Sequence, residues 1–205
     1  RSLSEVVLMF KEIIRPAVTL FLVCAVITGA LAVVNDITGP IIEERDRAAL
    51  QESLSTVLPG AEEFSDAVSR DELINRGYKA GERISNLYQA TAGGETVGYV
   101  VEVVTKGYGG DISMLVGIDS SLSVTGVKIM SHSETPGLGA KADDEEYLKQ
   151  YIGAIPGNLY HVVKTTPWND GDIQALSGAT VTSRAVANGV SEAASLVRSI
   201  VKGGE

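Results

Sequence analysis

An uncharged stretch of nineteen residues, 16–34, restricts more than any other feature what this chain can fold into. At 1.5 Å of rise per residue, a helix of that length spans about 28 Å, which is close to the hydrocarbon thickness of a bilayer. A cleaved signal peptide is the alternative, because Ala30-Leu31-Ala32 resembles a small-residue cleavage site. The stretch is longer than a usual signal-peptide core, and we therefore expect one transmembrane helix over residues 16–35.

The charges that flank this stretch predict its orientation. The basic residues before it are Lys11 and Arg15, and the acidic residues that follow it are Asp36, Glu43 and Glu44. The positive-inside rule then places the N-terminus in the cytoplasm and the rest of the chain outside, although Arg45 and Arg47 weaken the contrast. The single cysteine, Cys24, lies near the middle of the stretch and reads as a packing residue or, alternatively, as a lone metal ligand offered to a partner.

Residues 1–15 carry apolar side chains at helical spacing, with charged residues on the other face. This pattern predicts a short amphipathic cytoplasmic segment that lies on the membrane surface or against a partner. The chain starts with Arg1 rather than Met, so we expect further sequence to precede it.

Composition excludes several classes of function. The net charge of −9 argues against a nucleic-acid partner, because phosphates would repel the chain. One cysteine cannot form an internal disulfide or a Cys-rich zinc or iron–sulfur site. The two histidines, His132 and His161, show no metal-ligand spacing, so we predict no metal site.

Periodicity predicts an α+β fold in the remainder of the chain. We expect a turn at residues 35–40, a helix over 41–58 that ends at Pro59-Gly60, and a short helix with loops over 61–85. Expected strands cover residues 87–91, 97–105, 112–118, 123–130 and 159–164, and expected helices cover 143–151 and the segment after residue 180. The links between the first four strands are short, which favours an antiparallel sheet flanked by helices.

Two loops could bind a ligand. Residues 131–140 form a Gly- and Pro-rich loop directly after a strand, where binding groups often lie, or else a simple turn. Residues 177–182, Ser-Gly-Ala-Thr-Val-Thr, open the last helix, where unpaired N–H groups favour a phosphate. Alternatively, Ser177, Thr180 or Thr182 only caps that helix. Lys164 could be a phosphate counter-ion or a solvated surface lysine.

The apolar span, the Glu-Thr-Pro-Gly-Leu-Gly loop at 134–139 and the Ser-Gly-Ala-Thr-Val-Thr loop together resemble a known family. They are similar to the FMN-binding subunits of membrane redox pumps, namely the G subunit of the Rnf complex and the related C subunit of the sodium-translocating NADH:quinone reductase. The likeness covers nearly the whole chain and is closer to the Rnf protein. One position departs from the family pattern: Gln174 stands where Asp is usual, and Asp172 lies two residues upstream.

The resemblance implies a covalent cofactor. In that family the last threonine of the motif carries FMN through a phosphoester bond installed by a separate flavin transferase, and the matching residue is Thr180. The further FMN-binding residues that we predict are Tyr108, Glu134, Thr135, Gly137, Leu138, Gly139, Lys164, Ser177, Gly178, Ala179 and Thr182. We expect no catalytic residue, because a flavin needs only to be held, tuned and positioned.

The resemblance also implies the domain order and the function. We expect a helical connecting region over residues 36–85 and an extracytoplasmic FMN-binding domain over residues 86–205. The expected function is electron transfer within a bacterial inner-membrane complex that couples ferredoxin and NAD⁺ to Na⁺ or H⁺ movement. Its expected partners are the other Rnf subunits, the flavin transferase and the lipid bilayer.

Three alternatives remain open from the sequence. The chain could be a structural or assembly subunit, it could bind flavin reversibly, or it could be a hydrolase with Ser177 or Thr180 as nucleophile.

Overall fold

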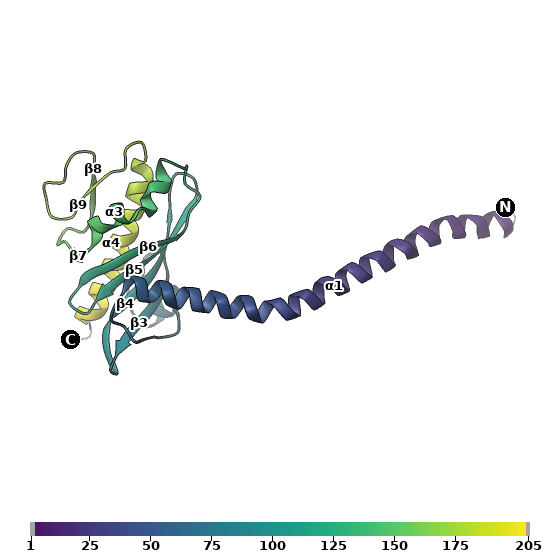
Figure 1. The fold of residues 1–205 in the computed structure, drawn as a ribbon, viewed down its shortest axis with the longest axis horizontal. Coiled ribbons are helices and arrows are strands. Elements are labelled where there is room, and N and C mark those ends of the chain that lie inside the picture. Colours follow the sequence, from purple (N-terminus) through teal and green to yellow (C-terminus); the bar gives the residue numbers. More distant parts are fainter. Residues whose placement is uncertain (1–2, 204–205) are drawn as a thin grey trace. The chain divides into compact units, whose positions relative to one another are not determined.

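A computed structural model shows one long N-terminal helix and a unit of strands and helices (Figure 1). The structure describes residues 3–203, and it describes the side chains of residues 14–203 except 40, 41 and 43. The chain divides into two compact units, Arg1–Ala49 and Leu50–Glu205, and each is described by itself.

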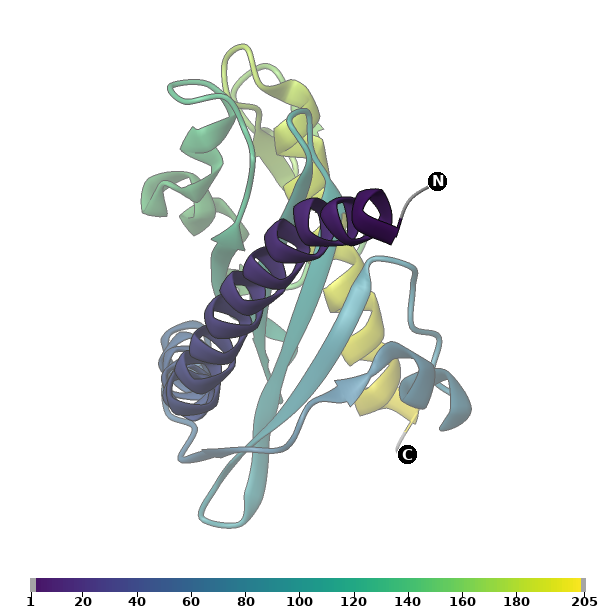
Figure 2. The same ribbon diagram turned by 90° about the vertical axis from the view of Figure 1, so that its right-hand side faces the viewer.

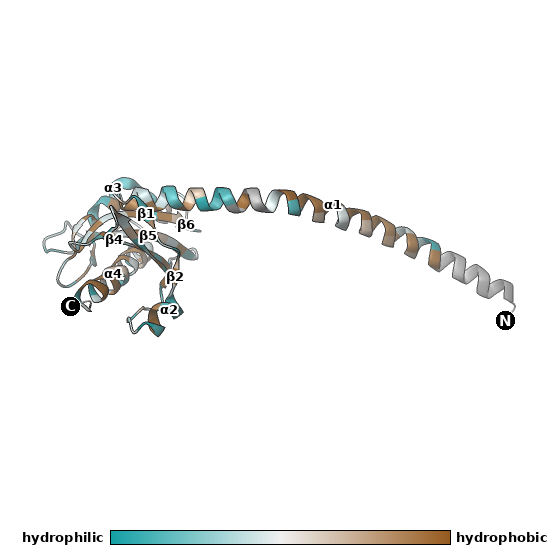
Figure 3. Cartoon of the chain, turned by 90° about the horizontal axis from the view of Figure 1, so that it is seen from below, coloured by the Kyte–Doolittle hydropathy of each residue, from teal (hydrophilic) through white to brown (hydrophobic). Residues whose placement is uncertain are grey.

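The first unit contains the apolar stretch, which is part of helix α1 (Leu3–Val57). By length and composition alone, the portion Ile14–Val57 is sufficient to cross a membrane. No residue in its most apolar stretch of 18 residues is buried. Figure 3 shows this band in brown, and Phe21 within it is 72% exposed. An apolar helix surface that no other part of the described chain covers is what a lipid-facing segment requires. The amphipathic face expected over residues 1–15 lies almost entirely outside the described side chains.

The turn expected at residues 35–40 is wrong, because α1 runs through this segment without interruption. Pro40 removes one N–H donor from the helix, which costs roughly 3 kcal/mol. The helical stretches on both sides are long enough to continue across one missing hydrogen bond. The expected end at Pro59-Gly60 is confirmed, since the helix stops at Val57 and Gly60 has a φ of 98°.

The second unit is built on a sheet of seven strands, and its antiparallel arrangement is as predicted. Four long strands form its centre: β3 (Ile84–Ala92), β4 (Glu95–Lys106), β5 (Asp111–Asp119) and β6 (Ser123–Ser131). Three two-residue strands extend it: β1 (Glu63–Phe64) and β2 (Val68–Ser69), which both pair with β3, and β7 (Gly153–Ala154), which pairs with β6. We did not predict these, because two residues are too short to display a period.

Residues 50–85 belong to the same compact unit as the sheet, although the sequence assigned them to a connecting region. The short helix expected among them is α2 (Arg70–Asn75), which Ser69 caps at its N-terminus by accepting a hydrogen bond from the Glu72 N–H. Through β1 and β2, this region adds to the sheet rather than only leading to it.

Both faces of the sheet are buried, and alternate residues face opposite sides. On one face, Val101 and Met114 belong to the core that includes Val186 and Val190 of helix α4 (Thr180–Gly203). On the other face, Val100 and Leu115 pack in a cluster with the end of α1, which contributes Leu54 and Val57, and with Leu58, which follows the helix. Figure 2 shows α4, in yellow, crossing behind the strands. The apolar stripe predicted for the last helix is therefore confirmed.

A pair of glycines receives the last turn of α1. Gly117 of β5 and Gly126 of β6 lie opposite each other in the strand register. A Cβ atom at Gly117 would lie 2.1 Å from the carbonyl oxygen of Val57, and one at Gly126 would lie 2.8 Å from the Val57 Cα. The Thr125 hydroxyl donates a 2.6 Å hydrogen bond to the same Val57 oxygen. The missing side chains thus allow the helix backbone to lie directly on the sheet.

The helix expected over residues 143–151 is wrong in its continuity. The segment contains two 3-10 turns, Gly139–Asp143 and Lys149–Tyr151, around a short helix α3 (Glu145–Leu148). Asp144 has extended backbone angles (φ −65°, ψ 129°), which separate the first turn from α3. Tyr147 and Tyr151 of this segment are buried in the core, and the Tyr151 ring makes an edge-to-face contact with Tyr160 outside the segment.

A small parallel pair completes the unit. The strand expected over residues 159–164 is β8 (His161–Val163), and it pairs in parallel with β9 (Asp172–Gln174), which we did not predict. The link over residues 164–171 is shorter than the dozen or so residues that a parallel connection usually needs. Hydrogen bonds inside the link hold it in a tight turn: the Asp172 carboxylate accepts from the N–H groups of Trp168 and Asn169.

Candidate functional site

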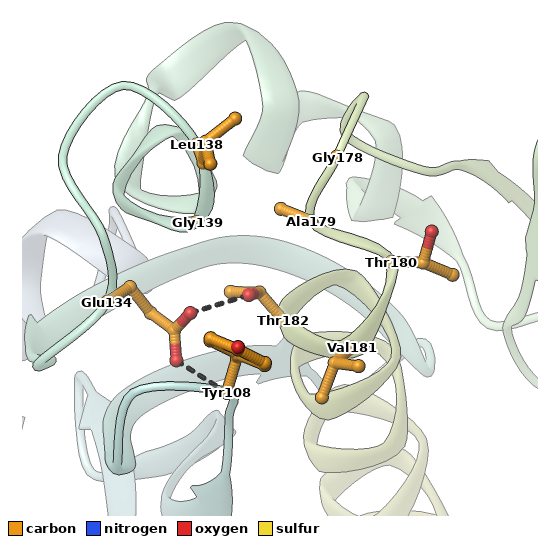
Figure 4. Close-up of a pocket in the computed structure, with 9 residues that line it drawn as sticks. All are labelled: Tyr108, Glu134, Leu138, Gly139, Gly178, Ala179, Thr180, Val181 and Thr182. Atoms are coloured by element: carbon orange, nitrogen blue, oxygen red, sulfur yellow. Dashed lines mark hydrogen bonds between the residues drawn. The ribbon is translucent and has the colours of Figure 1, made fainter.

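A cavity lies where three loops of the second unit meet (Figure 4). One loop follows β4, the second follows β6 and the third precedes α4. The cavity has a volume of about 410 Å³, which is within the range of cofactor sites. Its lining consists of Tyr108, Glu134, Leu138, Gly139, Gly178, Ala179, Thr180, Val181 and Thr182.

The structure therefore brings together eight of the residues predicted from the sequence. Thr135, Gly137 and Ser177 lie exposed in the same loops without lining the cavity, and Lys164 is exposed after β8, also outside the lining. Val181 was missed. The only indication in the sequence that Val181 lines the cavity is its position between two predicted residues, Thr180 and Thr182. A side chain in the first turn of a helix can face either the cavity or solvent.

Glu134 connects the three loops. Its Oε2 accepts a 2.6 Å hydrogen bond from the Thr182 hydroxyl, and its Oε1 accepts bonds of 2.8 and 2.9 Å from the N–H groups of Tyr108 and Gly109. Its own N–H donates to His132 Nδ1 at 3.2 Å. The side chain is only 7% exposed. Although we predicted Glu134 as a flavin contact, its carboxylate is already committed to bonds within the protein.

Two glycines make this arrangement possible. A Cβ atom at Gly107 would lie 2.1 Å from the Glu134 Oε1 atom, and one at Gly139 would lie 2.3 Å from the Oε2 atom. Any side chain at either position would therefore displace the carboxylate. Gly139 was among the residues predicted for the site, whereas Gly107 was not.

The hydrogen bonds of Glu134 predict a pH dependence of stability. Burial alone would raise the pKa of Glu134, but the bonds from Thr182, Gly109 and Tyr108 outweigh it and lower the pKa. A lowered folded-state pKa adds stability above the unfolded pKa of about 4.3, and that stability is lost as the pH falls through the folded value. We expect Glu134→Gln to remove this acidic limb, measured by the free energy of unfolding from pH 7 to pH 3. An unchanged acidic limb in the variant would contradict the assignment.

The first turn of α4 has free backbone donors. Among the described residues, no group accepts a hydrogen bond from the N–H of Thr180, Val181 or Thr182. The expectation that Ser177, Thr180 or Thr182 caps the helix is therefore wrong. Ala179 precedes the helix and has no acceptor side chain. The Ser183 hydroxyl instead accepts from Leu176 N–H and donates to the Ala179 oxygen, both at 3.0 Å, which fixes the loop on either side of residues 177–178.

Thr180 stands at the rim of the cavity. Its side chain is half-buried, and Figure 4 shows it directed away from Glu134, on the far side of the loop. Gly178 has a φ of 75°, and a Cβ there would lie 3.1 Å from a methyl carbon of Leu138, so the two loops approach closely. A group attached to the Thr180 oxygen would begin at the rim of the cavity rather than at its floor.

Hydrolytic chemistry finds no support in this arrangement. In the part of the chain that the structure describes, no side chain forms a hydrogen bond with the hydroxyl of Ser177 or Thr180. A nucleophilic serine or threonine needs a base within hydrogen-bond reach. The same part of the chain contains no group of three or more His, Cys, Asp and Glu side chains that could hold a metal ion.

The outer part of the cavity is apolar. Tyr108, Leu138 and Val181 come from three different segments, and they are 77%, 46% and 49% exposed. Large apolar side chains exposed around one hollow usually mark a binding site. Polar hydrogen-bond donors at one end and apolar surfaces at the other suit a flat ring system joined to a phosphate.

The position at which the chain departs from the family pattern lies in β9. The Gln174 N–H donates to the side-chain oxygen of Gln150 at 2.8 Å. Asp172, two residues upstream, uses its carboxylate to close the loop before β9, and these bonds lower its pKa. Its carboxylate is thus occupied by a structural role.

Comparisons with known proteins agree with this site. A family model for the FMN-binding domain matches residues 107–195, and a model for the RnfG N-terminal region matches residues 9–57. The first match includes every residue that lines the cavity. The chain thus contains an FMN-binding domain. The solved structure of NqrC from Shewanella oneidensis aligns with 58% of this chain and 59% of its own, at 22% identity and a TM-score of 0.49.

Two curated relatives match along almost their whole length. The G subunit of the Na⁺-translocating ferredoxin:NAD⁺ oxidoreductase complex of Acetobacterium woodii is 34% identical over 94% of this chain and 95% of its own. The G subunit of the proton-translocating ferredoxin:NAD⁺ oxidoreductase complex of Clostridium ljungdahlii is 32% identical over 90% of this chain and 91% of its own. This chain therefore belongs to the family of G subunits of Rnf ion-translocating oxidoreductase complexes.

Proposed function

We propose that this chain is the electron-transferring G subunit of a membrane-bound ferredoxin:NAD⁺ oxidoreductase, and that it carries FMN as a phosphoester of Thr180. The observation that carries the attachment is the first turn of α4, where the N–H groups of residues 180–182 have no acceptor among the described residues and a threonine stands at the rim of a cavity. A phosphate esterified there would receive these N–H groups and the positive end of the helix dipole.

The remaining residues of the cavity fit the other parts of the cofactor. Leu138, Val181 and Tyr108 offer apolar surfaces to a flavin ring, and Ala179 points into the space between the loops in Figure 4. A bound flavin supplies one-electron and two-electron chemistry. The chain itself needs to position the cofactor and to limit its access to water. Glu134 and Thr182 act indirectly, because their mutual hydrogen bond holds two walls of the cavity together.

The membrane arrangement is part of the proposal. Residues 16–35 cross the bacterial inner membrane once, with the N-terminus in the cytoplasm and the flavin-binding residues of segment 86–205 on the extracytoplasmic side. Support comes from the exposed apolar part of α1 and from the basic residues that precede it. The proposed partners are the other subunits of the complex, a flavin transferase and the bilayer. The names of the two relatives differ in the coupling ion, so the proposal includes either Na⁺ or H⁺.

A second candidate is a subunit that binds FMN reversibly. The observation that favours it is Gln174 in place of the usual Asp, because the transferase then meets an uncharged amide upstream of the acceptor loop. The cavity would be the same in both cases, and the candidates differ only in the bond at Thr180.

A peptide map separates the two candidates. Trypsin cleaves after Lys164 and Arg184, which releases residues 165–184 with the whole acceptor loop. We expect this peptide from the full chain, purified from cells that flavinylate other proteins, to carry the mass of one esterified FMN and to fluoresce in a denaturing gel. Fragment ions should place the group on Thr180. An unmodified peptide from a protein that releases flavin on denaturation would instead establish reversible binding.

A further inference from the structure

A groove continues from the cavity along one side of α4. A hollow of about 270 Å³ shares Val181 with the cavity, and a second hollow of about 320 Å³ shares Arg83 and Asn188 with the first. The α4 residues that line the two hollows lie at positions 181, 184, 185, 188, 191, 192 and 195. These spacings of three and four form one helix face, about 21 Å long at 1.5 Å per residue. We call this surface the α4 groove.

The end of the α4 groove beside the cavity is basic. Lys106 and Arg184 line it, both are exposed, and neither has an ion-pair partner among the described residues. Arg83 lies between the hollows, but Glu192 neutralises it through a 2.6 Å ion pair and also accepts its N–H at 2.9 Å. The carboxylate of Glu192 is therefore already paired with Arg83. Lys106 and Arg184 remain available to an anionic ligand, on a chain whose net charge is −9.

The rest of the α4 groove offers neutral polar groups. Asn188, Ser191 and Ser195 line it. The Thr105 hydroxyl, in a side chain that is 2% exposed, also belongs to its wall and has no hydrogen-bond partner among the described residues. A wall of donors with two open cations at one end is complementary to an occupant with carboxylates at the matching end.

We propose that the α4 groove binds an extended acidic segment of a neighbouring subunit, with its carboxylates at Lys106 and Arg184. The length of the groove favours this occupant, because about 21 Å accommodates roughly six extended residues at 3.3 Å each. A small anion would occupy only the basic end, and a lipid surface would not use the donors inside the groove. The segment would end beside Val181, next to the cavity. The proposal rests on membership in a multi-subunit complex, and only the proximity to a flavin depends on the proposed function.

Zero-length cross-linking of the intact complex tests the contact directly. A carbodiimide joins a lysine to a carboxylate only when the two already touch. We expect Lys106 to be joined to an Asp or Glu of another subunit, whereas Lys79, which is exposed and lacks an ion pair among the described residues, should give no such product. A Lys106 that stays unlinked, or that joins only carboxylates of its own chain, would overturn the proposal.

Charge reversal supplies the second arm. We expect K106E/R184E to weaken retention of the chain in the complex roughly tenfold during a salt wash. The control K79E/K202E changes the net charge equally and should retain the chain as the wild type does. Equal losses in both variants would reduce the effect to overall charge and overturn the proposal. Flavin fluorescence of each variant reports separately on the proposed function.

Discussion

A Thr180→Val variant is expected to contain no covalently bound flavin, whereas the wild-type chain should be fluorescent in a denaturing gel. Valine has nearly the shape of threonine and keeps the β-branch, so the first turn of α4 should form unchanged, but it offers no oxygen for a phosphoester. Because the attachment depends on one atom, the expected effect is complete. In-gel fluorescence and intact mass, measured on both proteins from the same cells, provide the readout.

Two further variants identify the oxygen. Thr180→Ser keeps a hydroxyl at the same position and should retain part of the fluorescence. Ser177→Ala removes the neighbouring exposed hydroxyl and should retain all of it. A fluorescent Thr180→Val protein whose 165–184 peptide is modified at Ser177 or Thr182 would show that the wrong residue has been chosen. Circular dichroism of each variant confirms that any loss is chemical rather than a failure to fold.

A Gly117→Ala substitution should have the second large effect, on stability. The new methyl group would lie 2.1 Å from the Val57 oxygen and 2.6 Å from its carbonyl carbon. Both are backbone atoms, so no side-chain rotation can relieve the clash. The end of α1 must move off the sheet, which would also break the hydrogen bond from Thr125. Overpacking of this kind costs about 3 kcal/mol or somewhat more. Chemical unfolding of the full chain in detergent, followed by the signal of the sheet, measures the loss.

The matched control is Gly157→Ala. A Cβ at Gly157 has nothing within 4 Å, and the backbone there does not require a positive φ. We expect this variant to unfold within about 0.5 kcal/mol of the wild type. A Gly117→Ala protein as stable as the Gly157→Ala protein would mean that α1 does not rest on the sheet as described.

The sequence predicted the parts of the fold whose residues repeat a period many times. Residues 16–34, the four long strands and the stripe of α4 that contains Val186 and Val190 each carry their signal in the chain itself. The order of the strands then places two loops together without further information. In an antiparallel meander β4 and β6 run in the same direction, so both strands terminate at the same end of the sheet. Loops 107–110 and 132–138 must therefore be neighbours.

The rest depended on contacts that no local pattern records. Glu134 was expected to contact the flavin because the family resemblance implies that the 134–139 loop packs on it, but its carboxylate accepts hydrogen bonds from N–H groups of a hairpin more than twenty residues away. Ser183 controls the shape of the acceptor loop from inside a regular helix. The strands β8 and β9 pair in parallel across a short link because side-chain bonds from Asp172 close the loop between them. Each of these requires coordinates of both partners.

The bonds of Glu134 have a consequence for electron transfer. Its carboxylate, the Thr182 hydroxyl and two loop N–H groups saturate one another before any cofactor arrives. The ordering entropy of the pocket is therefore lost when the chain folds and not when the flavin is attached. Fixed dipoles around a flavin also need to turn little when its charge changes. A flavin in this pocket should consequently have a small reorganisation energy, and its electron-transfer rates should depend mainly on driving force and on distance to the next redox centre.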